Sequence, residues 1–167
     1  MRIVRAHPLE LAAFAPFGEV LDAAAGPGRP VNQGRGRRVD VAPRLAHDPA
    51  AARPVAAVYR LAGSALPLAV EVLERHALSS QVFWPLDGAR AVLAVAPSLP
   101  DGSPDAARLA AFVSGPGQGF HYLPGTWHAP LFALDRAAAF AMHMWEAGTA
   151  RDCEEFPLPE AVLIAGD

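Results

Sequence analysis

Two stretches indicate how this chain folds: Leu73-Glu-Arg-His-Ala-Leu-Ser-Ser-Gln-Val-Phe-Trp-Pro-Leu86 and Gly117-Gln-Gly-Phe-His-Tyr-Leu-Pro-Gly-Thr-Trp-His-Ala-Pro-Leu131. Each is a short apolar and aromatic run that is interrupted by polar residues and closed by proline or glycine. This pattern is typical of strands in a small barrel with polar groups on its inner face. If the two stretches face each other across a barrel, four polar side chains converge: Glu74, His76, Gln81 and His128.

The rest of the chain repeats this alternation of short strands and turns. Strands are expected at 2–6, 17–21, 54–61, 68–76, 81–84, 89–96, 120–123, 131–135 and 138–145. Residues 8–14 predict a short helical turn, whereas residues 105–113 fit a helix or a strand. The alternation in the fourth strand places Val70, Val72, Glu74 and His76 on one face. We therefore predict an all-β barrel or sandwich with minor helices, formed by residues 1–167 as a single domain.

The composition excludes several classes of function. All 14 basic residues are arginine, which excludes Schiff-base lysine chemistry, pyridoxal phosphate attachment and a Walker-type phosphate loop. The net charge of −3 argues against nucleic acid as a partner. Apolar runs are too short to span a membrane, and the first residues do not resemble a secretory signal, so a cytoplasmic location is expected.

Cys153 is the only cysteine, so the chain can form neither an intrachain disulfide nor a cysteine-based zinc finger. Its neighbours Asp152, Glu154 and Glu155 would raise the pKa of the thiol rather than lower it. A structural role is therefore favoured over a role as nucleophile.

The segment from Val31 to Asp40 combines an amide, flexible glycines and three arginines. Arginines in one short stretch could clamp a carboxylate through paired hydrogen bonds. The alternative is a solvated basic loop, and residue types alone favour that alternative.

The spacings Glu74-x-His76-x4-Gln81 and Pro124-Gly125-x2-His128 resemble the two-part signature of cupins, a double-stranded β-helix or jelly-roll superfamily. In this chain Glu74 stands where the first cupin histidine would be, and Gln81 where the glutamate would be. Nitrogen and oxygen donors with two imidazoles suit a divalent metal such as Ni, Mn, Fe or Zn. The expected metal ligands are His76, Gln81 and His128. Without a metal, the same groups could act as acid, base and hydrogen-bond donors. Alone, His76 would more simply be a surface or capping residue.

A closer resemblance, to the ureidoglycolate lyase family, covers most of the chain. The specific blocks are Glu-Arg-His-x-Leu-x-Ser-Gln-x-Phe from residue 74 and Gly-x-Trp-His-x-Pro-Leu from residue 125. Supporting blocks include residues 14–20 and 110–113, and Cys153-Glu154. The resemblance implies a cupin-like, dimeric cytoplasmic enzyme of allantoin degradation, which cleaves ureidoglycolate to glyoxylate and urea. A hydrolase would release ammonia and carbon dioxide instead.

The resemblance also implies roles for individual residues. The expected catalytic residues are Glu74, His76 and His128, with acid and base not assigned separately. The elimination removes the hydroxyl proton as the C–N bond breaks and adds a proton to the leaving urea nitrogen. The residues expected to bind the small carboxylate substrate are Asn32, Arg38, Gln81, His121, Tyr122 and Trp127.

Several positions depart from the family pattern: Leu123, Ala129, Met144 and Trp145. The alternation puts His121 on the same face as Leu123, so His121 could replace a missing imidazole. Two other functions remain open. The chain could be a metal-dependent cupin acting on another small carboxylic acid, or a barrel that binds a small acid without catalysis.

Overall fold

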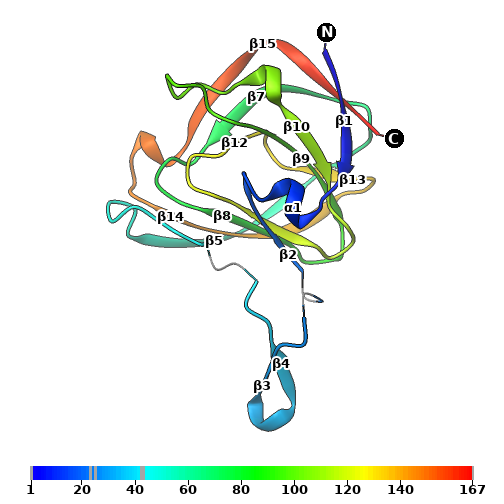
Figure 1. The fold of residues 1–167 in the computed structure, drawn as a ribbon, viewed down its shortest axis with the longest axis vertical. Coiled ribbons are helices and arrows are strands. Elements are labelled where there is room, and N and C mark those ends of the chain that lie inside the picture. The colour runs from blue at the N-terminus through cyan, green and yellow to red at the C-terminus, as the bar shows by residue number, and fades with distance from the viewer. Residues whose placement is uncertain (1, 23, 25, 42–43, 167) are drawn as a thin grey trace.

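The computed structural model describes residues 2–22, 24, 26–41 and 44–166, and shows an all-β, cupin-like barrel (Figure 1). The larger sheet has eight strands, in the order β10 (Ala110–Val113), β1 (Arg2–Pro8), β15 (Glu154–Ala165), β7 (Leu68–Arg75), β12 (Trp127–His128), β9 (Arg90–Ala96), β13 (Phe132–Leu134) and β6 (Gly63–Ser64). Strand β9 also pairs with β10, which closes the strands from β10 to β9 into a ring.

A second sheet packs against this ring. It has five strands, in the order β2 (Gly18–Leu21), β11 (Gly119–Tyr122), β8 (Gln81–Pro85), β14 (Ala138–Glu146) and β5 (Arg53–Leu61). Helical structure in the described residues is limited to α1 (Leu11–Phe14) and three 3-10 turns, η1 (Asn32–Gly34), η2 (Ala106–Arg108) and η3 (Ala150–Asp152). The prediction of an all-β fold is confirmed, and the ambiguous segment 105–113 divides into η2 and β10. No helix of the described residues is long and apolar enough to cross a membrane.

Strand β9 lies between two hydrophobic cores. Ala91, Leu93 and Val95 pack into the first core, which the five-stranded sheet covers with aromatic residues such as Phe83, Phe120 and Phe140. Val92, Ala94 and Ala96 point the other way, into the second core. A strand that is buried on both faces has no polar face, which explains why this stretch of the sequence is almost continuously apolar.

Strand β7 breaks the alternation that was expected of it. Val70 and Leu73 are three residues apart, yet both pack into the second core. Glu74 follows Leu73 and faces the first core, where it lies against Phe83. The prediction that Val70 and Glu74 share a face is therefore wrong, because strict alternation does not hold along the whole strand.

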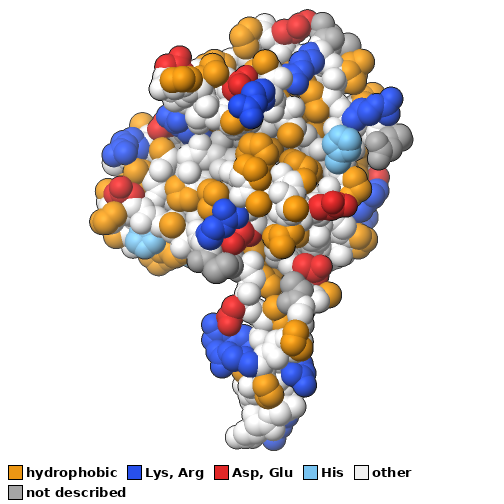
Figure 2. All heavy atoms as spheres, in the orientation of Figure 1, with side chains coloured by type: hydrophobic (Ala, Val, Ile, Leu, Met, Phe, Trp, Pro, Cys, Tyr) orange, Lys and Arg blue, Asp and Glu red, His pale blue; other side chains and the backbone are white. Residues whose placement is uncertain are grey.

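A β-hairpin, here called the arm, projects from the barrel (Figure 1). It consists of β3 (Arg29–Val31), the turn η1 and β4 (Gly36–Arg38). Its strands pair only with each other among the described residues. Arginine side chains gather on it in the space-filling view (Figure 2).

Candidate metal and active site

Three ligating side chains meet where β7 and β12 pair. Glu74 is directly opposite His128 in the register of these strands, and His76 follows the end of β7. Each residue offers one ligating atom, and these three atoms all lie within 4.8 Å of one another. The expected convergence is therefore present for these three residues. The two histidine-bearing segments are neighbours in one sheet rather than opposite walls of the barrel.

Backbone carbonyls determine which nitrogen of each imidazole faces the cluster. His76 Nδ1 lies 2.6 Å from the Asp152 carbonyl oxygen, and His128 Nδ1 lies 2.8 Å from that of Thr126. A carbonyl only accepts, so each neutral ring carries its proton on Nδ1 and presents the lone pair of Nε2. Both Nε2 atoms are buried and lack a hydrogen-bond partner among the described residues. This is the arrangement of metal-binding histidines held by outer hydrogen bonds.

The charge states also suit metal binding. Burial, together with nearby His128, lowers the pKa of His76. Burial acts to raise the pKa of Glu74, but the nearby His128, whose Nε2 lies 3.5 Å from Glu74 Oε1, and His76 outweigh it, and the pKa is lowered. These shifts favour a carboxylate at Glu74 and a neutral imidazole at His76 near neutral pH. The Glu74, His76 and His128 group could hold a divalent metal.

A cavity of about 200 Å³ opens beside Glu74 and His128. Tyr122 forms part of its wall and stacks on the His128 ring, with 4.0 Å between ring centroids. Burial raises the pKa of Tyr122, so its hydroxyl stays protonated. The other lining residues are Tyr59, Leu61, Phe83, Ala129, Pro130 and Leu131. A larger cavity of about 690 Å³ lies elsewhere, beside β1 and β13, and no group of metal-ligating side chains was found there in the described residues.

Tyr59 is a site residue that the sequence did not reveal. It lies on β5, and burial followed by the charge of Glu74 raises the pKa of its phenol. Only the register of β5 against β14, in which Tyr59 is opposite Phe140, brings it to the cavity. No local motif around Tyr59 could have indicated this position.

Gln81 reaches the cluster from the facing sheet. It is buried, its Nε2 lies 3.9 Å from Met144 Sδ, and its Oε1 has no hydrogen-bond partner among the described residues. The Gln81 side chain also affects the pKa of His76, so the two side chains are neighbours. The free Oε1 would be a neutral oxygen donor next to the three ligating residues.

Trp127 faces away from the cavity, because it directly precedes His128 in a strand. It packs into the second core, and its Nε1 donates to the Gly102 carbonyl over 3.0 Å. The Arg75 guanidinium lies 4.6 Å from the centroid of its ring. The structure thus gives Trp127 structural contacts and does not bring it to the cluster.

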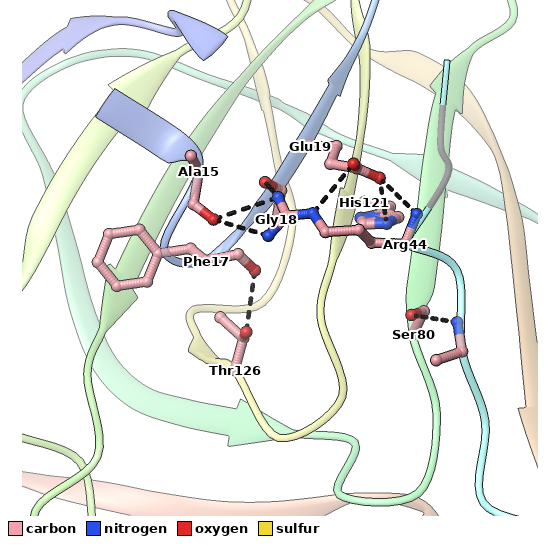
Figure 3. A network of polar contacts seen from close by, with 9 residues as sticks. Ala15, Phe17, Gly18, Glu19, Arg44, Ser80, His121 and Thr126 are labelled. Carbon is pink, nitrogen blue, oxygen red and sulfur yellow. Dashed lines mark hydrogen bonds and ion pairs between the residues drawn. The ribbon is translucent and has the colours of Figure 1, made fainter. Parts of the chain in front are cut away.

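His121 is also turned away from the cavity, on the opposite face of β11 from Tyr122. Its Nε2 lies 3.1 Å from a Glu19 carboxylate oxygen, and Arg44 donates to the other oxygen over 3.0 Å (Figure 3). Arg44 also donates to the carbonyls of Ala15 and Gly18. His121 therefore does not replace an imidazole in the cluster, and it belongs to a separate buried network that attaches the segment around Arg44 to the barrel.

Asn32 and Arg38 lie on the arm, outside their own barrel (Figure 1). Arg38 Nε donates to Asp40 over 2.7 Å, and both side chains are exposed. Within a single chain, Asn32 and Arg38 therefore do not reach the cluster of Glu74, His76 and His128.

The positions that depart from the family pattern occupy different surroundings. Ala129 lines the cavity, and Met144 contacts Gln81, so both adjoin the cluster. Trp145 faces the other way and stacks on His47 with 4.7 Å between ring centroids. The small side chain at position 129 leaves space in the cavity wall that a histidine would fill.

The buried His121 makes stability depend on pH. Burial lowers its pKa below 6.5, although Glu19 opposes the shift. As pH falls, His121 therefore takes up a proton in the unfolded chain before it does so in the folded one. Its contribution to the free energy of unfolding is complete above pH 6.5 and is lost as pH falls below that value. We expect the free energy of unfolding in urea to decline less between pH 7.5 and 5.5 in His121→Asn than in the unsubstituted protein. His7→Asn, at an exposed position, should keep the full decline, and equal slopes for all three proteins would contradict this account.

A family model and curated relatives match almost the whole chain. Residues 1–165 match the family described as "Ureidoglycolate lyase". A ureidoglycolate lyase from Burkholderia mallei (strain NCTC 10229) is 35% identical over 167 residues, which cover 100% of this chain and 96% of the relative. One from Rhodobacter capsulatus is 37% identical over 161 residues, which cover 96% of each. Among solved structures, a dTDP sugar isomerase from Desulfovibrio desulfuricans G20 matches with a TM-score of 0.44 and 15% identity, over 85% of this chain and 82% of that chain.

Proposed function

The chain belongs to the ureidoglycolate lyase family, and we propose that it cleaves ureidoglycolate to glyoxylate and urea in the cavity beside Glu74, His76 and His128. The observation that carries the proposal is the cluster itself. A carboxylate and two imidazoles with free Nε2 atoms are held at the wall of a small cavity, in a chain that matches the family from end to end.

The size of the cavity supports a small substrate. At about 200 Å³ it is smaller than the ~300–1,000 Å³ of pockets for drug-sized ligands. Apolar residues and the two tyrosines form the remainder of its wall. A small acid with a hydroxyl and a ureido group suits such a space.

The reaction transfers one proton within the substrate. The hydroxyl group of ureidoglycolate loses a proton as its carbon becomes the aldehyde carbon of glyoxylate, and the C–N bond electrons go to the departing nitrogen, which gains a proton to form urea. One group that accepts and then returns a proton can serve both steps. Glu74 is the ionised side chain in the cavity wall and is the first candidate. The protonated hydroxyls of Tyr59 and Tyr122 can hold the substrate's oxygens by donating hydrogen bonds.

A divalent ion fits the unpartnered atoms of the cluster. Glu74, His76 and His128 would hold Ni, Mn or Zn, with Gln81 Oε1 as a further oxygen donor, and the ion would polarise the substrate's oxygens. A cytoplasmic location, a role in allantoin degradation and a homodimer are parts of the same proposal.

The proposed activity is tested by product analysis. Purified protein is incubated with ureidoglycolate, with and without added Ni or Mn, and urea, glyoxylate and ammonia are measured. We expect urea and glyoxylate in equal amounts, and a large loss of activity after chelation and in Glu74→Gln. Release of ammonia in place of urea would identify a hydrolase, and the absence of any product would contradict both.

One observation favours a second candidate. Ala129 replaces a histidine of the family pattern in the cavity wall, which leaves room for a different small carboxylic acid. Turnover of another small acid, without turnover of ureidoglycolate, would support a related metal-dependent enzyme. A rise in melting temperature with glyoxylate, without turnover of any acid, would instead indicate a barrel that only binds.

A further inference from the structure

The cavity of a single chain has no positive side chain for an anionic substrate. None of its described lining residues is an arginine, and the chain contains no lysine. Arg75 lies near the cluster in sequence but is paired with Glu154 and stacked on Trp127. Directional recognition of a carboxylate, which a guanidinium group provides with two parallel hydrogen bonds, is therefore missing.

The arm carries the guanidinium groups that the cavity lacks. It contains four arginines, Arg29, Arg35, Arg37 and Arg38, all of them exposed. Arg38 is paired with Asp40, and Arg37 donates to the backbone carbonyls of Pro27 and Gly28, just before the arm. Arg35 lies at the tip, directly after the turn η1. The arm extends away from its own barrel, so these groups lie away from the cavity of their own chain (Figures 1 and 2).

The arm also has no hydrophobic support of its own. No described residue from Gly26 to Val41 is buried. Two neighbouring residues at its tip, Asn32 and Gln33, have left-handed backbones with φ of 53° and 59°. A two-stranded hairpin by itself is at best marginally stable in water, and left-handed residues other than glycine persist only where their surroundings support them. These properties are expected of a segment that packs against a partner.

The mouth of the cavity is complementary to the arm in charge. Glu155 is directly opposite Glu74 in the register of β15 and β7, is exposed, and forms no ion pair within the described residues. Cys153 is exposed beside them, with its Sγ 3.8 Å from Glu74 Oε2. An exposed carboxylate with no ion pair among the described residues thus lies beside Glu74, which lines the cavity proposed to bind an anion.

We propose that the arm of a second copy of this chain closes the cavity mouth and supplies its arginines, Arg35 foremost, to the substrate's carboxylate. The proposal rests on the proposed function for the identity of the anion. The exchange is reciprocal, because in a two-fold dimer each arm reaches the other copy's barrel. The exposed Glu155 carboxylate, opposite Glu74 in register, is complementary in charge to the arginines of the arm.

Cross-linking tests the position of the arm without any need for catalysis. Arg35→Cys adds a second thiol to a chain whose only native cysteine is exposed beside Glu74, a residue of the cavity wall. After oxidation at alkaline pH, we expect a covalent dimer in which residue 35 of one chain is linked to Cys153 of the other. Arg35→Cys combined with Cys153→Ser, and Leu86→Cys at a site that is 58% exposed, should not give this link. A link within one chain, or no link between positions 35 and 153, would overturn the proposal.

Mixing two inactive variants tests whether the arm acts on the partner's site. His128→Ala has a defective site and an intact arm, whereas Arg35→Gln/Arg37→Gln/Arg38→Gln has an intact site and an arm that keeps only Arg29. After subunits are exchanged in equal amounts, one competent site forms in each mixed dimer, so up to about one quarter of the unsubstituted activity should return. No recovery in mixed dimers confirmed by native mass spectrometry, or full activity of the triple variant alone, would contradict the proposal. If the unsubstituted protein does not act on ureidoglycolate, the proposed function fails, and cross-linking still decides the position of the arm.

Discussion

Replacing His128 with alanine is expected to reduce ureidoglycolate turnover by roughly 100-fold or more while the barrel stays folded. The imidazole supplies one of three ligating atoms of the cluster and stacks on Tyr122, which forms part of the cavity wall. Its Nδ1 is held by the backbone carbonyl of Thr126, two residues earlier, which directs Nε2 toward the cluster. The measurements are initial rates of urea formation and metal content by mass spectrometry on the same samples.

The control for this substitution is His47→Ala. His47 is exposed and stacks on Trp145 outside the cavity, so its loss should leave turnover and metal content close to those of the unsubstituted protein. Circular dichroism would verify that both variants keep their β-structure. Full activity of His128→Ala would remove this residue from the site. Loss of metal with full activity would show instead that the ion is structural or adventitious.

Gly18→Ala is expected to destabilise the fold by about 3 kcal/mol or more. An added Cβ would lie 1.8 Å from the His121 carbonyl oxygen and 2.9 Å from the Phe14 ring. Neither obstacle can move easily, because the first belongs to the backbone of β11 and the second is fully buried. The strands would have to separate beside Glu19, which would weaken its contacts with His121 and Arg44. The measurement is the free energy of unfolding in urea.

Gly36→Ala is the matched control for that substitution. Gly36 also lies in a strand, but an added Cβ there would be 3.5 Å from the nearest atom and meets ordinary van der Waals contact. Its stability should stay within about 0.5 kcal/mol of the unsubstituted protein. If Gly18→Ala also unfolds with a free energy within about 0.5 kcal/mol of the unsubstituted protein, β2 and β11 have room for a Cβ at position 18, and this account is wrong.

The sequence predicted the cluster well where spacing within one strand and its turn was informative. Glu74 and His76 stand two residues apart at the end of a strand, and Pro124-Gly125 positions His128 at the start of another. Turn residues act locally, so they can be recognised without the fold. Their convergence on a single point is what the structure adds, through the register that sets His128 against Glu74.

The sequence was less informative about which face of each strand lines the cavity. His121 precedes the cavity residue Tyr122, and Trp127 precedes the cavity residue His128. Both His121 and Trp127 point away from the cavity. Alternation gives two possible faces for a strand but does not say which of them is inside. The irregularity between Val70 and Leu73 shows that even the alternation can fail within one strand.

Residue types and local patterns were thus sufficient to predict an all-β chain, to exclude lysine-based chemistry and to place a carboxylate and two imidazoles as candidates. These properties depend on near neighbours in the chain. Tertiary structure was needed to bring Tyr59 to the cavity, to assign His121 to a network with Glu19 and Arg44, and to show that the arginine arm lies outside its own barrel. These placements depend on the pairing of strands that are far apart in sequence, which no local pattern specifies.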